Sequence, residues 1–311
     1  MPSNWQQRDL AAVVDLPAEP LVVDRQAAIA EQVRAGLDNR LRALAAHDPG
    51  TRLGTDPEEL HQMRVAVRRM RAMLQAARPF LDQSWSEPLR AELGWLGRAL
   101  GPVRDLDVLL ERLRQESADL PTDERAAAAR LISGLEVEHG AARVEMLAAL
   151  DSDRYLDLLR ALATAVRTTP TASDVDSERA LRELVLRQFH KLRKAVDRLP
   201  ADPADQQLHA LRIRGKRVRY TAELAQPVLG RPAQQLIRAA RHFQDVLGEH
   251  QDACVAEERV RALLSGLGHG VDAAVAFVAG RLVERERTRR AERRAQWVPA
   301  WEALAEAAAA T

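Results

Sequence analysis

The residues of this sequence that are best suited to chemistry are basic side chains that recur in two matching segments. The segment LHQMRVAVRRMR (60–71) aligns with LHALRIRGKRVR (208–219) without a gap, and five of the positions are identical. Such a repeat indicates a shared role for its basic residues. These are His61, Arg64, Arg68, Arg69 and Arg71 in the first segment, and His209, Arg212, Lys216, Arg217 and Arg219 in the second.

The spacing places most of these cations along one side of a helix. Arg64, Arg68 and Arg71 fall within roughly 60° of one another on a helix of about 3.6 residues per turn. They adjoin an apolar stripe that includes Leu60 and Val67. A solvated helix face normally interleaves Glu with Arg, yet residues 60–81 and 208–222 contain no acid. The cations therefore need an anion from another element or from a ligand, and guanidinium and ammonium groups at one-turn spacing suit a linear chain of phosphates.

A third basic run precedes the second segment. Arg187, His190, Lys191 and Lys194 stand at i, i+3, i+4 and i+7, which is one face of a helix. Because a short loop joins this helix to the second repeated helix, we expect the two to pack antiparallel and to bring their cations together. We assign all four residues to the candidate ligand site.

Acidic residues near the repeated helices offer another interpretation of the cations. LGPVRDLDV (100–108) aligns with LGEHQDACV (247–255), which pairs Asp105 with Asp252. We expect these acids to brace the basic helices or cap a turn rather than to act in catalysis. Arg104 has no basic counterpart in the second segment, and we include it among the ligand residues. The alternatives stay open: the cations pair with neighbouring acids, and His61 and His209 bond backbone carbonyls.

Composition predicts that helices position these residues. Apolar residues make up 46% of the 311 and aromatic residues only 4%, while good helix formers dominate. We predict an all-α protein with a tail at 1–25, a first repeat at about 26–167 and a second at about 178–305. Each repeat reads as a four-helix unit, and polar stretches at 46–56 and 168–177 are predicted loops, the latter dividing the repeats.

Charge and cysteine usage limit the classes of function. The net charge is only +1, so attraction for a polyanion must come from local clusters. A single cysteine, Cys254, excludes an internal disulfide framework and a multi-thiolate metal site. We expect no cofactor and no metal. The start lacks a basic head followed by an apolar run, and no apolar stretch approaches the roughly 20 residues of a membrane span. We therefore expect a cytoplasmic protein without a membrane partner.

The two repeated segments resemble the signature helices of the CHAD domain, the conserved histidine α-helical domain. LGPVRDLDVLL (100–110), FHKLRK (189–194) and RRAQWVPAWEAL (293–304) are similar to later elements of that family, so the resemblance covers about residues 26–305. It implies two four-helix bundles related by pseudo-twofold symmetry, with a basic groove or channel between them. It also implies binding of inorganic polyphosphate by the basic residues above and, in some bacterial members, association with polyphosphate granules. Gly215 departs from the family pattern, in which Ala is commoner.

Enzymatic functions are disfavoured by the motifs that the sequence lacks. No Glu-x-Glu-x-Lys tunnel signature, GxxxxGK[ST] loop, GxSxG elbow or HExxH pair is present, and the eight histidines are dispersed. We predict a non-enzymatic polyphosphate-binding module with no catalytic residue. Two alternatives remain: a helical protein that binds nucleic acid, whose phosphodiesters would attract the same cations, and a scaffold for an acidic protein partner. The sequence leaves the oligomeric state open.

Overall fold

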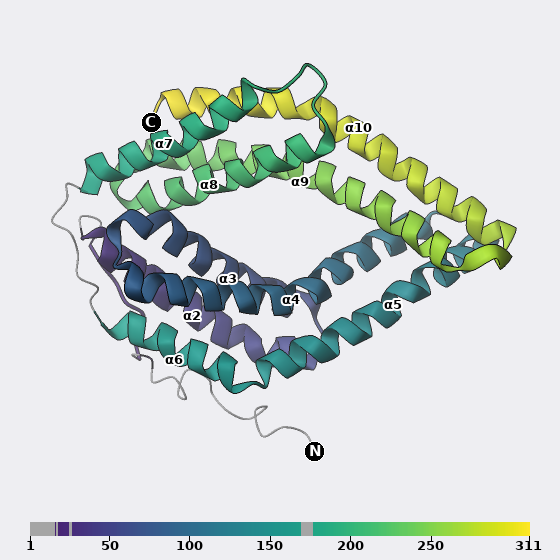
Figure 1. Ribbon diagram of the computed structural model, residues 1–311, viewed down its shortest axis with the longest axis horizontal. Helices are drawn as coiled ribbons and strands as arrows, with labels where there is room; N and C mark the ends of the chain where they lie inside the picture. The colour runs from purple at the N-terminus through teal and green to yellow at the C-terminus, as the bar shows by residue number, and fades with distance from the viewer. Residues whose placement is uncertain (1–15, 17, 25–26, 169–176) are drawn as a thin grey trace. The chain divides into compact units, whose positions relative to one another are not determined.

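The predicted all-α class is confirmed. The computed structural model describes residue 16 and residues 18–24, 27–168 and 177–311, and within these ranges all regular secondary structure is helical (Figure 1). The helices are α2 (Ile29–Leu53), α3 (Pro57–Ala77), α4 (Gln83–Ala118), α5 (Thr122–Leu150), α6 (Asp153–Arg167), α7 (Ser177–Val196), α8 (Asp205–Leu229), α9 (Arg231–Gly266) and α10 (Ala273–Ala309), with short 3₁₀ turns at Arg78–Phe80 and Gly268–Gly270. None of these helices is both long enough and apolar enough for a transmembrane segment.

The chain forms two compact units, each assembled from separate stretches of sequence. The first unit comprises Met1–Arg104, Ala142–Val185 and Tyr220–Gly230, and the second comprises Asp105–Ala141, Leu186–Arg219 and Arg231–Thr311. Helices α4, α5, α7 and α8 therefore contribute one part to each unit. The division into sequence repeats and the pseudo-twofold relation between them remain predictions. Most of the predicted loop at 168–177 lies outside the described residues.

In the first unit, the apolar stripe of the repeated helix is part of the core. Helix α2 packs against α3 and α6. Leu60, Met63 and Val67 of α3 are buried, as the helical spacing predicts, and Leu37 and Leu41 of α2 are fully buried. Burial of this stripe fixes which face of α3 remains for its cations.

The predicted loop at 46–56 is wrong, because α2 continues to Leu53. The polar residues of this stretch have partners within the first unit. Asp48 is only 3% exposed, accepts a hydrogen bond of 2.8 Å from the Tyr155 hydroxyl and pairs with Arg52 at 2.6 Å. The helix ends at Gly54, whose φ of 70° is the left-handed conformation of a helix C-cap.

The beginnings of the two repeated helices differ. Asp56 caps α3, because its side chain accepts a hydrogen bond from the backbone N–H of Glu58 at 2.8 Å. Helix α8 has no such aspartate cap at Asp202, although an Asp-Pro pair stands there as it does at 56–57. The helix begins at Asp205, and the side chain of Gln207 accepts a hydrogen bond from the backbone N–H of Ala204 at 2.7 Å.

The core of the second unit lies along α9 and α10, which run side by side (Figure 1). Leucine, valine and alanine side chains of α4, α5, α9 and α10 form one buried cluster. Beyond it, the rings of Phe189 and Trp301 stack with centroids 5.7 Å apart, and Phe243 contacts Trp301 at 6.2 Å. Three aromatic residues thus join α7, α9 and α10, which holds α7 beside the rest of the unit.

Gly215 lets the Phe243 ring approach α8 closely. A Cβ at Gly215 would lie 2.9 Å from Cδ1 of Phe243, and Phe243 is fully buried. We expect Gly215→Ala to lower the free energy of unfolding by about 1–3 kcal/mol through overpacking. Gly280→Ala is the matched control, because a Cβ there meets nothing within 4 Å and should raise stability by up to about 1 kcal/mol. Urea denaturation of both variants measures the difference. A Gly215→Ala variant as stable as Gly280→Ala would contradict this explanation.

Candidate anion-binding site

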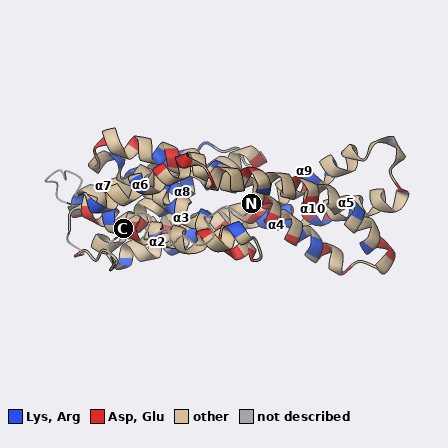
Figure 2. Ribbon diagram, turned by 90° about the horizontal axis from the view of Figure 1, so that it is seen from below, with Lys and Arg blue, Asp and Glu red and all other residues tan. Residues whose placement is uncertain are grey.

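The sequence-predicted basic residues are divided between the two units. The first unit holds six of them and the second holds nine. Figure 2 shows basic (blue) and acidic (red) positions interleaved along the same helices, in agreement with the net charge of +1. A binding site must therefore be a local cluster of cations. The first unit contains His61, Arg64, Arg68, Arg69, Arg71 and Arg104, and the second contains Arg187, His190, Lys191, Lys194, His209, Arg212, Lys216, Arg217 and Arg219.

In the first unit, α3 and α4 bring three of the arginines around His61. Burial is the main cause that lowers the pKa of His61, and Arg104, Arg68 and Arg64 lower it further, whereas Glu58 raises it. The imidazole is therefore neutral at pH 7, and the positive charge of this cluster comes from the arginines. The structure thus places Arg104 beside the repeated helix, while its role as a ligand residue stays a prediction.

The matched arginines of the two repeats contact matched glycines. Nη1 of Arg64 donates a hydrogen bond of 2.7 Å to the carbonyl oxygen of Gly101. In the second unit, a Cβ at Gly248 would lie 3.4 Å from Nε of Arg212. Gly101 and Gly248 are the aligned glycines of the two LG segments. Arg64 therefore also helps to hold α3 against α4, which limits its use as a free ligand group.

Arg69 and Arg71 lie apart from the His61 cluster. Arg71 is exposed beside Gly94, where a Cβ would lie 3.5 Å from its Nε. Arg69 lies near Arg40 of α2 and lowers its pKa, although burial is the larger cause. Nε of Arg69 is buried and has no hydrogen-bond partner within the described part of the chain.

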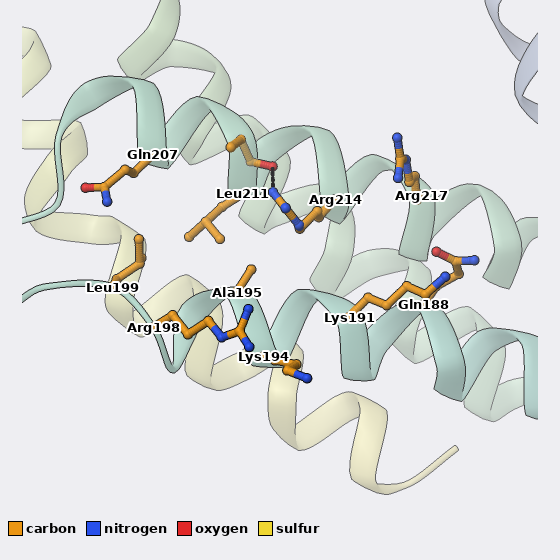
Figure 3. Close-up of a pocket in the computed structure, with 11 residues that line it drawn as sticks. Gln188, Lys191, Lys194, Ala195, Arg198, Leu199, Gln207, Leu211, Arg214 and Arg217 are labelled. Atoms are coloured by element: carbon orange, nitrogen blue, oxygen red, sulfur yellow. Dashed lines mark hydrogen bonds between the residues drawn. The ribbon is translucent and has the colours of Figure 1, made fainter.

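In the second unit, α7 and α8 form a basic pocket of about 470 Å³ (Figure 3). Three of the ligand residues predicted from the sequence lie together here, namely Lys191, Lys194 and Arg217. Two further cations of the pocket, Arg198 and Arg214, were missed. No described residue that lines the pocket is acidic; its lining consists of Gln188, Lys191, Lys194, Ala195, Arg198, Leu199, Gln207, Ala210, Leu211, Arg214 and Arg217.

Helical spacing accounts for the pocket and could have revealed the missed residues. Lys191, Lys194 and Arg198 stand at i, i+3 and i+7 along one side of α7 and its continuation, and Arg214 and Arg217 stand at i and i+3 on α8. Arg214 also donates a hydrogen bond of 3.3 Å to the carbonyl oxygen of Ala210, which Figure 3 shows as a dashed line.

The remaining cations of α8 lie on a different face from the pocket, and an acid accompanies them. Arg212 and Lys216 lower the pKa of Asp252, but partial desolvation outweighs them and raises it; Arg112 also lowers it and Asp105 raises it. The structure therefore places Asp252 where it can brace the basic helix, as expected from the sequence.

Four predicted site residues lie neither in the α7–α8 pocket nor among the cations that act on Asp252. Arg187 and His190 are exposed on α7, and neither lines the pocket. His209 and Arg219 are half-buried on the side of α8 that holds Arg212. Nδ1 of His209 has no hydrogen-bond partner in the described ranges, so the backbone-carbonyl alternative is not seen at that atom.

Comparison with known sequences identifies related proteins. A family model of the CHAD domain matches residues 35–261. Uncharacterised proteins from two strains of Mycobacterium tuberculosis are each 30% identical to this chain over 253 residues. The alignment covers 78% of this chain but only 45% of each relative, so the chain spans less than half the length of the curated relatives it matches.

Comparison with solved structures agrees on the fold. The crystal structure of the CHAD domain from the plant Ricinus communis matches with a TM-score of 0.70 and 27% identity, over 95% of this chain and 96% of that one. PptA from Streptomyces chartreusis matches with a TM-score of 0.69 over 88% of this chain and 98% of that one. Its 23% identity supports similarity of fold alone.

Proposed function

We propose that this chain, which belongs to the CHAD domain family, binds inorganic polyphosphate through its basic helices and catalyses no reaction on it. The resemblance of the two signature helices to that family implies this ligand class. The residues proposed to bind it are the basic residues predicted from the sequence, together with Arg198 and Arg214 of the α7–α8 pocket. In the cell, the same binding would attach the protein to polyphosphate granules.

The basic pocket is the observation that carries the proposal. Its five cations are exposed and converge from two neighbouring elements of one unit. Like charges at this spacing repel one another, so an empty pocket is less favourable than one that holds an anion. Arginine offers paired N–H groups to phosphoryl oxygens, and lysine adds a point charge. The cations are Lys191, Lys194, Arg198, Arg214 and Arg217.

The arrangement suits a linear ligand with repeated charge better than a single phosphate. From Lys191 to Arg198 the backbone advances roughly 10 Å, at about 1.5 Å per residue. One phosphate group offers four oxygens at most to these five cations, whereas a chain of phosphates can contact each cation in turn. We therefore infer that several phosphate units occupy the pocket together.

The chemistry of the lining residues favours binding over catalysis. Apart from its cations, the described lining consists of glutamine, alanine and leucine. General acid–base or nucleophilic catalysis needs a group such as His, Glu, Asp, Cys or Ser, or a lysine that burial has desolvated. Lys191 and Lys194 are exposed. Phosphoryl transfer to water would also need a group that positions the nucleophile. This supports the proposal of a binding module.

The lining also bears on the nucleic-acid alternative. Proteins that bind single strands without sequence preference stack bases on aromatic side chains, and the described lining of the pocket contains none. Phosphate contacts alone would give a weak preference for nucleic acid. Competition separates the alternatives: long-chain polyphosphate should displace single-stranded RNA from the protein, and an acidic peptide of equal charge should compete poorly with polyphosphate.

A titration with polyphosphates of defined length tests the proposal. Affinity should rise with chain length until the basic surface is filled, and the affinity per binding site should then level off. The logarithm of the affinity should fall linearly with the logarithm of the salt concentration, because bound cations release the counterions of the polyanion. Isothermal titration calorimetry at several salt concentrations measures both effects. Equal, salt-insensitive binding of orthophosphate and long chains would refute it.

A further inference from the structure

Away from the basic pocket, the second unit brings together three side chains that share the ability to ligate a metal ion. Asp205 is the first residue of α8, while His250 and Cys254 lie one turn apart on α9. One ligand atom from each lies within 4.8 Å of the other two. Residues four apart on a helix share a face, so α9 presents its imidazole and thiol side by side.

The buried imidazole of His250 faces the carboxylate of Asp205. Its side chain is 1% exposed, and Nε2 lies 3.2 Å from Oδ1 of Asp205. That distance is an ion-pair contact, although Nε2 makes no well-aligned hydrogen bond with a described residue. Buried polar atoms in native proteins almost always make one. Nε2 therefore lies within the group of three side chains, next to the Asp205 carboxylate, with its hydrogen-bonding capacity incompletely used.

We propose that Asp205, His250 and Cys254 bind one divalent metal ion of the zinc class. The ligands would be a carboxylate oxygen of Asp205, Nε2 of His250 and Sγ of Cys254. A mixed set of carboxylate, imidazole and thiolate is typical of Zn²⁺, which binds four ligands at about 2.0–2.3 Å. Three protein ligands leave the fourth position to water or to an incoming group. This proposal is independent of polyphosphate binding.

Two arginines of α10 that face the site can keep other partners when a metal takes Asp205. Arg290 lies 3.6 Å from Oδ2 of Asp205 but only 3.2 Å from a carboxylate oxygen of Glu257. Arg294 bonds Asp205 at 3.0 Å and also pairs with Asp202 at 2.5 Å. Neither guanidinium would be left without a carboxylate. The two bound anionic ligands, carboxylate and thiolate, also neutralise the charge of the ion.

The surroundings of Cys254 argue against a redox or nucleophilic role for its thiol. Cys254 is 7% exposed, and burial raises its pKa to about 11. Reactive cysteines are accessible and have a lowered pKa. The position of Cys254 beside the imidazole of His250 and the carboxylate of Asp205 is instead the arrangement of a metal ligand.

Cobalt titration of the chelator-treated full chain tests the proposal, with Co²⁺ alone as the probe. We expect one ion to bind per chain. Its spectrum should show a thiolate-to-cobalt charge-transfer band in the near ultraviolet and the intense visible bands of a four-coordinate ion. Zn²⁺ should then displace it, because its affinity for such a site is higher. Failure of the wild-type chain to show the charge-transfer band at stoichiometric Co²⁺ would overturn the proposal.

Single variants assign the ligands. Cys254→Ala should abolish the charge-transfer band, and Asp205→Asn should weaken Co²⁺ binding at least tenfold. His242→Gln, at an exposed histidine of the same helix, is the matched control and should bind as the wild type does. A band that survives Cys254→Ala would overturn the assignment. If that variant does not fold by circular dichroism, X-ray absorption of the zinc-loaded wild type decides: one sulfur ligand at about 2.3 Å supports the site, and its absence refutes it.

Discussion

Neutralising four cations of the α7–α8 pocket should reduce polyphosphate affinity at least a hundredfold without lowering thermal stability. The change is Lys191→Gln, Lys194→Gln, Arg198→Gln and Arg214→Gln in one chain. Charge-assisted hydrogen bonds contribute about 1.5–3 kcal/mol each, so loss of even two phosphate contacts accounts for such a factor. The four side chains are exposed, and glutamine keeps length and helix propensity, so the core is untouched. Calorimetric titration with long-chain polyphosphate measures the loss.

A second variant with the same change in net charge separates the pocket from a general charge effect. Arg114, Arg130, Arg160 and Arg179 are exposed, and each pairs with a surface acid. Exposed pairs of this kind contribute only about 0–1 kcal/mol. Replacing these four by glutamine should change polyphosphate affinity less than fivefold. Equal losses in both variants would show that net charge alone attracts the ligand, and unchanged binding in the pocket variant would place the site elsewhere.

The salt dependence of the pocket variant provides an independent reading of the same prediction. For a flexible single-stranded polyanion, each neutralised phosphate contributes about 0.7 to the slope of log affinity against log salt. Removal of four contacts should therefore lower the magnitude of that slope by roughly 3. Misfolding would instead abolish binding at all salt concentrations, and circular dichroism would reveal it directly.

The fold class followed from the sequence because helix propensity and the spacing of apolar residues both favour helices along most of this chain. Strong helix formers and a buried stripe of Leu60, Met63 and Val67 specify α3 without knowledge of its neighbours. The error at 46–56 had a tertiary cause, because Asp48 and Arg52 look like loop residues until Tyr155 and Asp151 supply their partners.

The candidate sites were predictable only where one helix contains all the residues. The repeated cations are visible because each set lies within a single segment. Arg198 and Arg214 join the pocket only once the facing sides of α7 and α8 are known. The metal-binding cluster was missed for the same reason, since Asp205 is far in sequence from His250 and Cys254. Sequence spacing is informative within a helix but does not reveal which helices meet.

The second large effect concerns stability, and it arises from a buried ion pair of the second unit. Nε of Arg112 donates a hydrogen bond of 2.6 Å to Glu286, whose side chain is fully buried, and Arg112 also lies 3.7 Å from the nearly buried Glu116. We expect Arg112→Gln to lower the free energy of unfolding by about 3 kcal/mol. This is the low end of the roughly 3–5 kcal/mol for a broken buried pair, because Arg289 still reaches Glu116 at 2.5 Å and Glu286 at 3.4 Å.

The loss should depend on pH in a defined direction. Burial is the main cause that raises the pKa of Glu286 from 4.5 to about 7; Arg112 opposes the rise and Glu116 adds to it. The unfolded chain loses this proton near pH 4.5 while the folded chain keeps it to about pH 7. Stability therefore falls as pH rises through that window. Without Arg112 the pKa is higher still, so the fall is larger and continues above pH 7.

Urea denaturation at pH 5 and pH 8 tests this prediction. The difference between wild type and Arg112→Gln should be small at pH 5 and largest at pH 8. The double variant Arg112→Gln and Glu286→Gln should recover more than half of the loss at pH 8, because an amide needs no counter-charge. Arg114→Gln on the same helix should cost less than about 1 kcal/mol, since both Arg114 and its partner Glu136 are exposed. A loss that is equal at both pH values, or that the double variant does not relieve, would show that Arg112 acts through packing rather than by neutralising the buried carboxylates.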